Sequence, residues 1–203
     1  MHLLSIAISK RLVADNPQVF EPDLAKSYSN LACLYNDIRR FDESEKMHLL
    51  SIAIRKRLVA DNPQVYEPEL AESYNNLACL YCNTRRFDES EKMHLLSIAI
   101  CKRLVADNPQ VYEPKLAKSY NNLASLYSIT QRFKESKEMF LSAIAIHKRL
   151  VADNPQVYEP ELAGSYNNLA CLYRKSQNFK ESEEMYLSAV TIFEQLVDDN
   201  PKV

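Results

Sequence analysis

The chain has 203 residues, of which 46% are apolar and 26% are charged, as is usual for a folded globular protein. Its 25 basic and 27 acidic residues give a net charge of −2, so no broad cationic surface is available to attract nucleic acid. No apolar run approaches the ~18–20 residues needed to cross a bilayer. Composition therefore argues against nucleic-acid partners and against a membrane-spanning protein.

An internal repeat dominates the sequence. The string MHLLSIAI begins at Met1 and returns at Met47 and Met93, so the period is 46 residues (47 − 1 and 93 − 47), and altered copies begin at Met139 and Met185. A fixed period of 20–50 residues is typical of a solenoid, in which one small unit stacks on copies of itself. Because the same string recurs inside the chain, its N-terminal copy is not a targeting peptide.

This period predicts one all-α domain over residues 1–203, built from antiparallel helix pairs. We expect an orphan second helix at 1–15, followed by repeats at about 21–61, 67–107, 113–153 and 159–199. The chain would then open inside a repeat. Exposed Leu3, Ile6 and Ile8 would leave an apolar end, so we expect either a fragment of a longer repeat protein or association through uncapped terminal helices.

The first helix of each repeat, helix A, is expected to begin at a proline. In the unit 62–107, a loop is predicted from residue 62 to 67, and Pro68 is predicted at the first helical position, where its missing N–H costs nothing. The apolar positions then recur in steps of four, three and four, at Leu70, Tyr74, Leu77 and Tyr81. This spacing predicts an amphipathic helix that ends near Arg85.

The second helix, helix B, is expected to begin near Asp88. Asp88 with Glu91 predicts a capping box, as do Asp42 and Glu45 one repeat earlier. Apolar residues cover much of the helix, which indicates a helix packed between neighbours. The chain has one glycine, Gly164, so the turns between the helices are made without it.

One repeat carries the motif residues Tyr74, Leu77, Ala78, Tyr81, Phe87, Ser90, His94 and Ser97. This pattern resembles the tetratricopeptide repeat over essentially the whole chain, although the unit is longer than the usual 34 residues. Within that family it is most similar to the kinesin-light-chain type, through its "NNLA-LY" helix A. The resemblance implies a right-handed α-solenoid, a concave surface lined by the A helices, and asparagines that contact the backbone of a bound partner.

A second stripe of helix A lies opposite the tyrosines and is rich in asparagine. An asparagine side chain offers both a donor and an acceptor, which suits the N–H and C=O groups of an extended peptide. The alternative is that these amides connect one helix A to the next and contact no ligand. The predicted peptide-binding residues are Asn30, Asn75, Asn76, Asn83, Asn121, Asn122, Asn167, Asn168, Lys118 and Arg174.

Residues of this stripe differ between repeats, whereas the packing positions do not. Lys26 becomes Glu72, Lys118 and then Gly164 at one position of the repeat. Such a change of charge along the groove would distinguish the side chains of a ligand. The alternative is unconstrained drift of surface residues after duplication.

Other constellations indicate little chemistry. Cys79-x-x-Cys82 has the spacing of a zinc site but lacks a second pair of ligands, and His48 and His94 give way to an aromatic residue, Phe140, at the same position. We therefore expect no metal, no cofactor and no enzyme activity. Five cysteines without a paired framework indicate reduced thiols and a cytoplasmic protein.

The predicted function is a non-catalytic scaffold that binds an extended peptide or partner segment in the groove of the A helices. A structural, self-associating repeat array without a groove ligand is the alternative. Helical-repeat RNA binding would need aromatic or basic groove residues, and this stripe carries asparagine, cysteine and serine.

Overall fold

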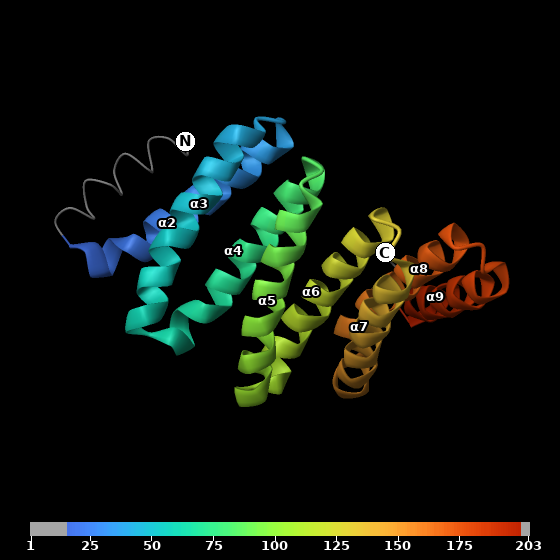
Figure 1. The fold of residues 1–203 in the computed structure, drawn as a ribbon. Coiled ribbons are helices and arrows are strands. Elements are labelled where there is room, and N and C mark those ends of the chain that lie inside the picture. The colour runs from blue at the N-terminus through green and yellow to red at the C-terminus, as the bar shows by residue number, and fades with distance from the viewer. Residues whose placement is uncertain (1–15, 200–203) are drawn as a thin grey trace. The chain divides into compact units, whose positions relative to one another are not determined.

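The computed structural model describes residues 16–199, and the predicted orphan helix at residues 1–15 lies outside them (Figure 1). The described part is helical, with no strand. Each of its helices has 21 residues, and they are α2 (Pro17–Asp37), α3 (Phe41–Asp61), α4 (Pro63–Asn83), α5 (Phe87–Asp107), α6 (Pro109–Ile129), α7 (Phe133–Asp153), α8 (Pro155–Lys175) and α9 (Phe179–Asp199). The even-numbered helices are the predicted A helices and the odd-numbered ones the B helices.

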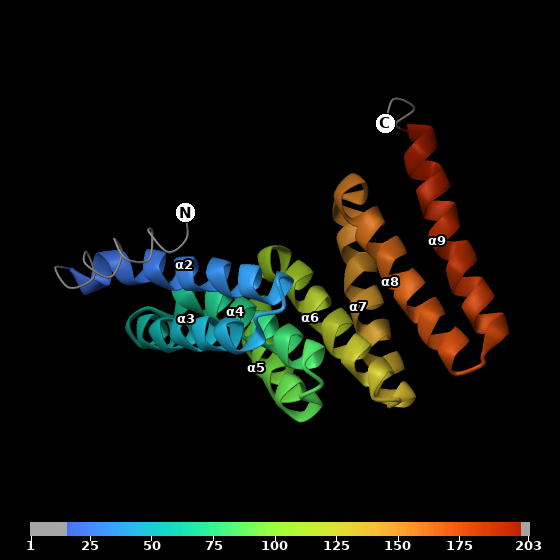
Figure 2. The ribbon, with the colours of Figure 1, turned by 90° about the horizontal axis from the view of Figure 1, so that it is seen from above.

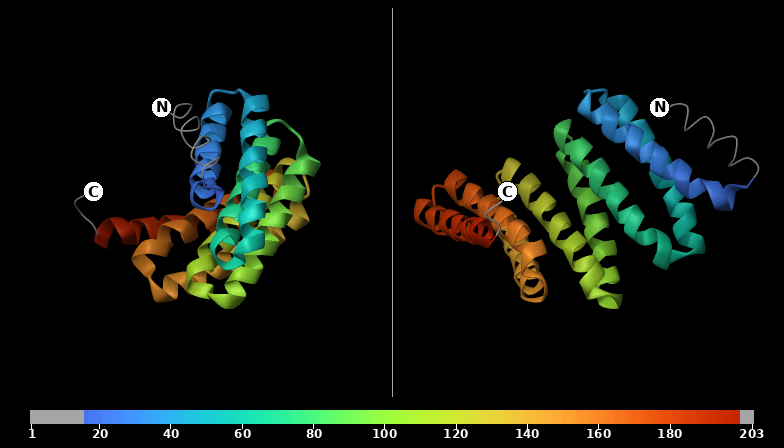
Figure 3. Two further views of the ribbon diagram at one scale, coloured as in Figure 1. Left: turned by 90° about the vertical axis from the view of Figure 1, so that its left-hand side faces the viewer. Right: turned by 180° about the vertical axis from the view of Figure 1, so that it is seen from behind.

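The chain divides into two compact units, unit 1 (residues 1–100) and unit 2 (residues 101–203). In unit 1, α3 packs against both α2 and α4. Figures 1 and 2 show α2 and α4 on one side of this unit and α3 and α5 on the other. In unit 2, α7 packs against α6 and α8, and α8 packs against α9. Figure 3 shows from two further sides that consecutive helices within each unit run antiparallel.

The A helices begin five residues earlier than predicted. Helix α4 starts at Pro63, so the expected loop from residue 62 to 67 is helical and Pro68 lies inside the helix. Asn62 alone separates α3 from α4, in an extended conformation (φ −146°, ψ 87°) of the kind that a following proline favours. Pro63 therefore takes the first helical position. Pro68 removes one backbone donor, and burial of Leu70 and Ala71 just beyond it offsets that loss.

The turn from helix A to helix B uses a left-handed residue that is not glycine. Arg39, Arg85, Gln131 and Gln177 have φ values of 60–62°. In the first turn, Arg40 N–H donates to Tyr35 C=O (2.7 Å) and Arg39 N–H to Asn36 C=O (3.0 Å), which is the Schellman pattern. That motif usually adds an apolar contact, and here the Arg40 guanidinium lies 4.5 Å from the Tyr35 ring centroid.

The predicted capping box of helix B is wrong. Helix α3 begins at Phe41, and its N-cap residue, Arg40, makes no side-chain capping bond, so Asp42 and Glu45 lie inside the helix. Glu45 instead binds the next repeat. Its Oε1 accepts a hydrogen bond from Tyr81 Oη (2.9 Å), and its Oε2 lies 2.6 Å from Arg86. Burial and this carboxylate raise the pKa of Tyr81 to about 12.

A buried serine closes every helical hairpin. Ser44 Oγ donates to the Ala32 carbonyl at 2.8 Å, and the same serine–alanine bond recurs at 2.7–2.9 Å in the three other repeats, at Ser90–Ala78, Ser136–Ala124 and Ser182–Ala170. These residues are among the small positions of the repeat motif. Their small size allows the two helices to approach closely, and the serine hydroxyl donates its hydrogen bond to a backbone carbonyl of helix A.

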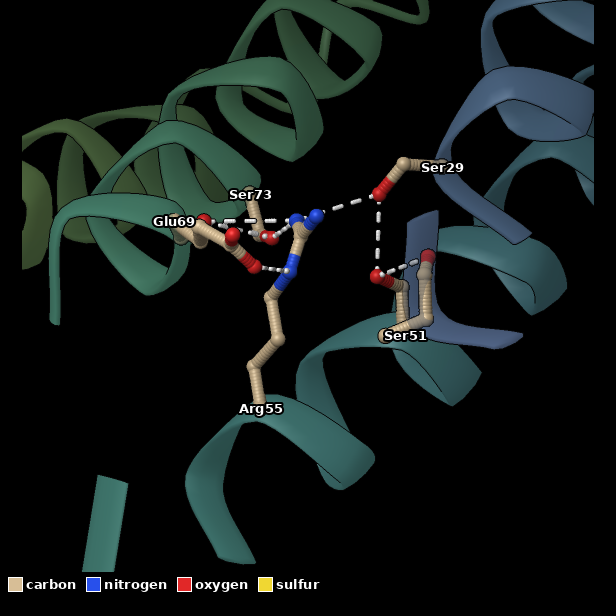
Figure 4. A network of polar contacts seen from close by, with 6 residues as sticks. Ser29, Ser51, Arg55, Glu69 and Ser73 are labelled. Atoms are coloured by element: carbon tan, nitrogen blue, oxygen red, sulfur yellow. Dashed lines mark hydrogen bonds and ion pairs between the residues drawn. The ribbon is translucent and has the colours of Figure 1, made fainter. Parts of the chain in front are cut away.

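One buried position of helix B carries a different residue in different repeats, and in α3 this residue is Arg55. This guanidinium donates to Ser29 Oγ (3.2 Å) on α2, and to Ser73 Oγ and the Glu69 carbonyl (3.3 Å) on α4, while its Nε lies 3.4 Å from Glu69 Oε2 (Figure 4). Cys101 and His147 occupy the position in later repeats and contact Ser119 and Ser165. Arg55 therefore connects two A helices across a B helix.

Replacing Arg55 with alanine is expected to lower the free energy of unfolding by about 2–4 kcal/mol, because several hydrogen bonds and the packing of the stem are lost together. Arg55→Met should cost less than about 1 kcal/mol, since a well-packed apolar side chain can replace a buried ion pair. The serines keep other partners in that variant, because Ser29 also bonds Ser51 and Ser73 also bonds the Glu69 carbonyl. Urea unfolding monitored by circular dichroism measures both losses, and equal losses would contradict the expectation that a well-packed apolar side chain can replace this guanidinium.

Candidate functional site

The predicted asparagines of unit 1 differ in burial and in their contacts. Asn75 is 8% exposed, and its Oδ1 lies 3.1 Å from Nδ1 of His94, so it sits between helices A and B. Asn76 is half-buried and Asn30 is exposed. Asn83 is exposed and donates from Nδ2 to Asn36 Oδ1 at 3.2 Å. The amides of Asn75 and Asn83 therefore bind neighbouring helices of the protein itself.

In unit 2 several predicted residues do come together. Lys118, Asn121, Asn122 and Asn168 line one pocket, whereas Asn167 and Arg174 lie outside its lining. Asn121 Nδ2 donates to Ser165 Oγ on α8 at 3.0 Å, so this amide connects two A helices. Its Oδ1 is buried and has no hydrogen-bond partner among the described residues. Buried acceptors of this kind usually find a donor.

The pocket has a volume of about 460 Å³ and lies between α6, α7 and α8. This size is within the ~300–1,000 Å³ range of ligand sites. Its lining comprises Pro114, Lys115, Lys118, Asn121, Asn122, His147, Tyr158, Glu161, Gly164, Ser165 and Asn168. Amides, lysine stems and a tyrosine thus surround one opening on the A-helix face.

Gly164 opens this pocket. A Cβ atom built on Gly164 meets no other atom within 4 Å, and its φ is not positive, so neither crowding nor backbone conformation requires glycine there. A glycine inside a helix costs roughly 1 kcal/mol relative to alanine. The equivalent positions of the other repeats carry the long, exposed side chains of Lys26, Glu72 and Lys118. A similar side chain at 164 would occupy the opening.

Charges of opposite sign stand on the two walls of the pocket. Lys115 and Lys118 come from α6, and Glu161 comes from α8. His147 at the base is buried, with Nδ1 2.9 Å from Ser165 Oγ. Burial lowers the pKa of His147 and the Glu161 charge offsets part of that shift, so the imidazole is neutral at pH 7. A ligand therefore meets a neutral floor between a cationic and an anionic wall.

The cysteines and the buried histidines considered above as metal ligands show no sign of a binding site in the described residues. All five cysteines are free. His48 and His94 are 2% exposed and pack in the core at the position of Phe140. Within residues 16–199 no cluster of three metal-ligating side chains occurs. None of the helices that the structure describes is long and apolar enough to span a bilayer.

Sequence reasoning missed several lining residues, notably Lys115, Tyr158, Glu161 and Ser165. Because α8 begins at Pro155, Tyr158 lies on helix A, whereas the predicted loop left it outside. Lys115, Glu161 and Ser165 lie on the predicted part of helix A but outside the asparagine stripe. The available signal was the single glycine of the chain at a position that is charged in the other repeats.

Comparisons with known proteins agree with this architecture. Family models described as "Tetratricopeptide repeat" match residues 24–64, 70–110 and 115–195. A search of curated proteins finds no match. Among solved structures, BtubC (BKLC) from P. vanneervenii is 21% identical, covering 96% of this chain and 89% of its own, with a TM-score of 0.71.

Two further structures are similar in fold. A Podosopora anserina protein, described as kinesin light chain-like with nearly identical TPR-like repeats, is 18% identical over 96% of this chain and 88% of its own, with a TM-score of 0.67. The apo form of RapI is 13% identical over 97% and 72%, with a TM-score of 0.69. The predicted resemblance to long-repeat, kinesin-light-chain-like proteins is thus matched by these folds. Because the family models cover most of the sequence, the chain belongs to the tetratricopeptide repeat family.

Proposed function

We propose that the protein is a non-catalytic scaffold that binds an extended segment of a partner protein on the A-helix face of unit 2. Tetratricopeptide repeats generally mediate protein–protein interactions. The pocket beside Gly164 is the main support for the proposal. Glycine destabilises a helix, yet it occupies a helical position where the missing side chain leaves room for a ligand side chain. Lys118, Asn122 and Asn168 lie at the same opening and would hold the peptide backbone.

The polar groups of the pocket suit an extended chain. Asn122 and Asn168 each carry a donor and an acceptor, which match the alternating N–H and C=O groups of a peptide that makes no helix of its own. The binding role of Asn30, Asn76, Asn167 and Arg174 stays a prediction.

The double variant Asn122→Ala/Asn168→Ala is expected to bind peptides at least tenfold more weakly than the wild type. Two lost hydrogen bonds of about 1 kcal/mol each correspond to roughly a 30-fold change in Kd. A random peptide library displayed on phage is selected on the wild-type protein, and the Kd of the best peptide is then measured by fluorescence anisotropy. Gln64→Ala removes an exposed amide of unit 1 that is outside the predicted binding residues, so it is the matched control and should leave the Kd unchanged.

Failure of the wild-type protein to select any peptide, or equal affinity of the folded double variant, would contradict the proposal.

The same proposal includes the right-handed winding of the array, the absence of catalysis and of nucleic-acid partners, and a cytoplasmic location. The free state of all five cysteines supports the last point, since reduced thiols persist in that compartment.

A further inference from the structure

Helix α3 presents an exposed stripe, one end of which, at Arg57, contacts α2 through Glu21. Its residues are Asp42, Lys46, Leu49, Leu50, Ala53 and Arg57, and all of them are exposed. The buried residues of α3, among them Ser44, Ser51 and Leu58, lie on the opposite side of the helix. Leu49 is 48% exposed and Leu50 is 37% exposed. Two adjacent leucines thus stand at the centre of a surface that is otherwise charged at both ends.

The stripe is complementary to itself when turned end for end. Asp42 lies seven residues before Leu49, and Arg57 lies seven residues after Leu50. Seven residues are close to two helical turns, so acid, leucine pair and base share one face. Against an antiparallel copy, Asp42 would meet Arg57 of the copy, and each Leu49 would meet a Leu50. A two-fold interface requires this kind of self-complementarity.

Arg57 can take part although it already has a partner. Its Nη2 lies 2.6 Å from Glu21 Oε1, but its side chain remains 60% exposed. A guanidinium has five donors, so it can bind a second carboxylate without giving up the first. Glu21 also holds this guanidinium in place at the edge of the stripe, which reduces the entropy lost when Asp42 of the copy arrives.

The leucines border a shallow, open depression of the α3 surface. It has a volume of about 420 Å³ and is lined by Asp42, Glu45, Lys46, Leu49 and Leu50. Helix α5 has the same sequence except for Cys101 in place of Arg55, and it carries a similar depression of about 430 Å³ at Asp88, Glu91, Lys92, Leu95 and Leu96. Each depression leaves room beside the leucines for an apolar side chain of a copy. Two such stripes on one chain also enlarge the contact beyond what a single helix provides.

The later B helices lack these properties. In α7, Lys134 takes the place of Asp42 and Ser142 that of Leu50, so an antiparallel copy would bring Lys134 against Arg149. In α9, Lys180 and Ser188 stand at the same two positions. The complementary charges and the leucine pair are thus lost together in both helices.

We infer that the α3 and α5 stripes form a two-fold interface with a second copy of this chain. No residue of these stripes lines the pocket beside Gly164, so the interface and the proposed peptide site rest on different residues. The core of the interface is the leucine pair, and its rim is the Asp42–Arg57 ion pair, which gives the antiparallel direction. The proposed partner is another copy of this chain because the charges along the stripe are complementary to those of the same stripe running in the opposite direction.

Sedimentation velocity of the full 203-residue chain at increasing concentration tests this inference. The wild type should form a reversible dimer, and Leu50→Ser/Leu96→Ser should raise the dissociation constant at least tenfold. Both serines copy the residues that α7 and α9 carry at the same exposed positions, so the fold is retained. Leu141→Ser removes a leucine that is 43% exposed on α7 and is the matched control, with no effect expected.

Charge exchange tests the antiparallel direction. Asp42→Lys/Asp88→Lys and Arg57→Glu/Arg103→Glu should each be monomeric alone, and an equimolar mixture of the two should restore the dimer. A wild type that remains monomeric near ~1 mM would overturn the inference. It would also be overturned by equal weakening in Leu141→Ser, or by a mixture that does not associate.

Discussion

Replacing Gly164 with lysine is expected to weaken peptide binding by at least tenfold while leaving the fold intact. Lysine is the residue that α6 carries at the equivalent position, Lys118, so the helix accepts it. Its side chain would extend into the opening that Gly164 leaves and exclude the ligand. The Kd of a selected peptide, measured by fluorescence anisotropy, reports the loss.

The variant Gly164→Ala distinguishes the effect of the open space at this position from the effect of glycine on the helix backbone. The added Cβ meets no atom within 4 Å, so peptide affinity should stay within about threefold, while helix propensity raises the free energy of unfolding by up to about 1 kcal/mol. A lysine variant that binds as tightly as the alanine variant would show that the pocket is not the binding site. Loss of binding in both variants would instead assign glycine a backbone role.

Stability is expected to fall steeply below pH 6.5 because of two buried histidines. Burial lowers the pKa of His48 and of His94 from 6.5 to about 4, and the charge of Arg55 adds to the effect on His48. The unfolded chain therefore binds more protons than the folded one between these pH values. The stability that depends on neutral imidazoles is complete above pH 6.5 and is lost as the pH falls toward 4.

Each shift corresponds to about 3 kcal/mol, so the pair contributes roughly 6 kcal/mol, which is comparable to the total stability of many domains. Urea unfolding at pH 7.5, 5 and 4 measures this loss. The double variant His48→Phe/His94→Phe carries the residue found at Phe140, where the same slot is 3% exposed. It should lose most of the pH dependence, and an unchanged slope would refute the assignment.

The repeat and its packing could be predicted from the sequence because they depend on periodic apolar residues. Leu77, Ala78 and Tyr81 were expected on the packed face of helix A, and all three are buried. The ends of the helices were harder to predict. Pro63 and Pro68 both satisfy the rule for a first helical position, and only the packing of the whole hairpin selects Pro63.

The candidate site was predicted in part. The asparagine spacing identified Asn122 and Asn168, which line the pocket. It did not separate them from Asn75, because one stripe of a helix includes residues that face a ligand and residues that face the next helix. That difference depends on the partner across the interface: His94 accompanies Asn75, whereas Phe140 stands at the equivalent position beside Asn121.

Contacts of Glu45 have a consequence for the order in which the array comes apart. This carboxylate belongs to one repeat, yet it holds Tyr81 and Arg86 at the turn of the following one. The Arg86 guanidinium also lies 4.2 Å from the Tyr81 ring centroid, so the turn and its anchor form one cluster. Loosening of a repeat therefore removes support from its successor, and amide hydrogen exchange at that turn should follow the opening of the preceding hairpin.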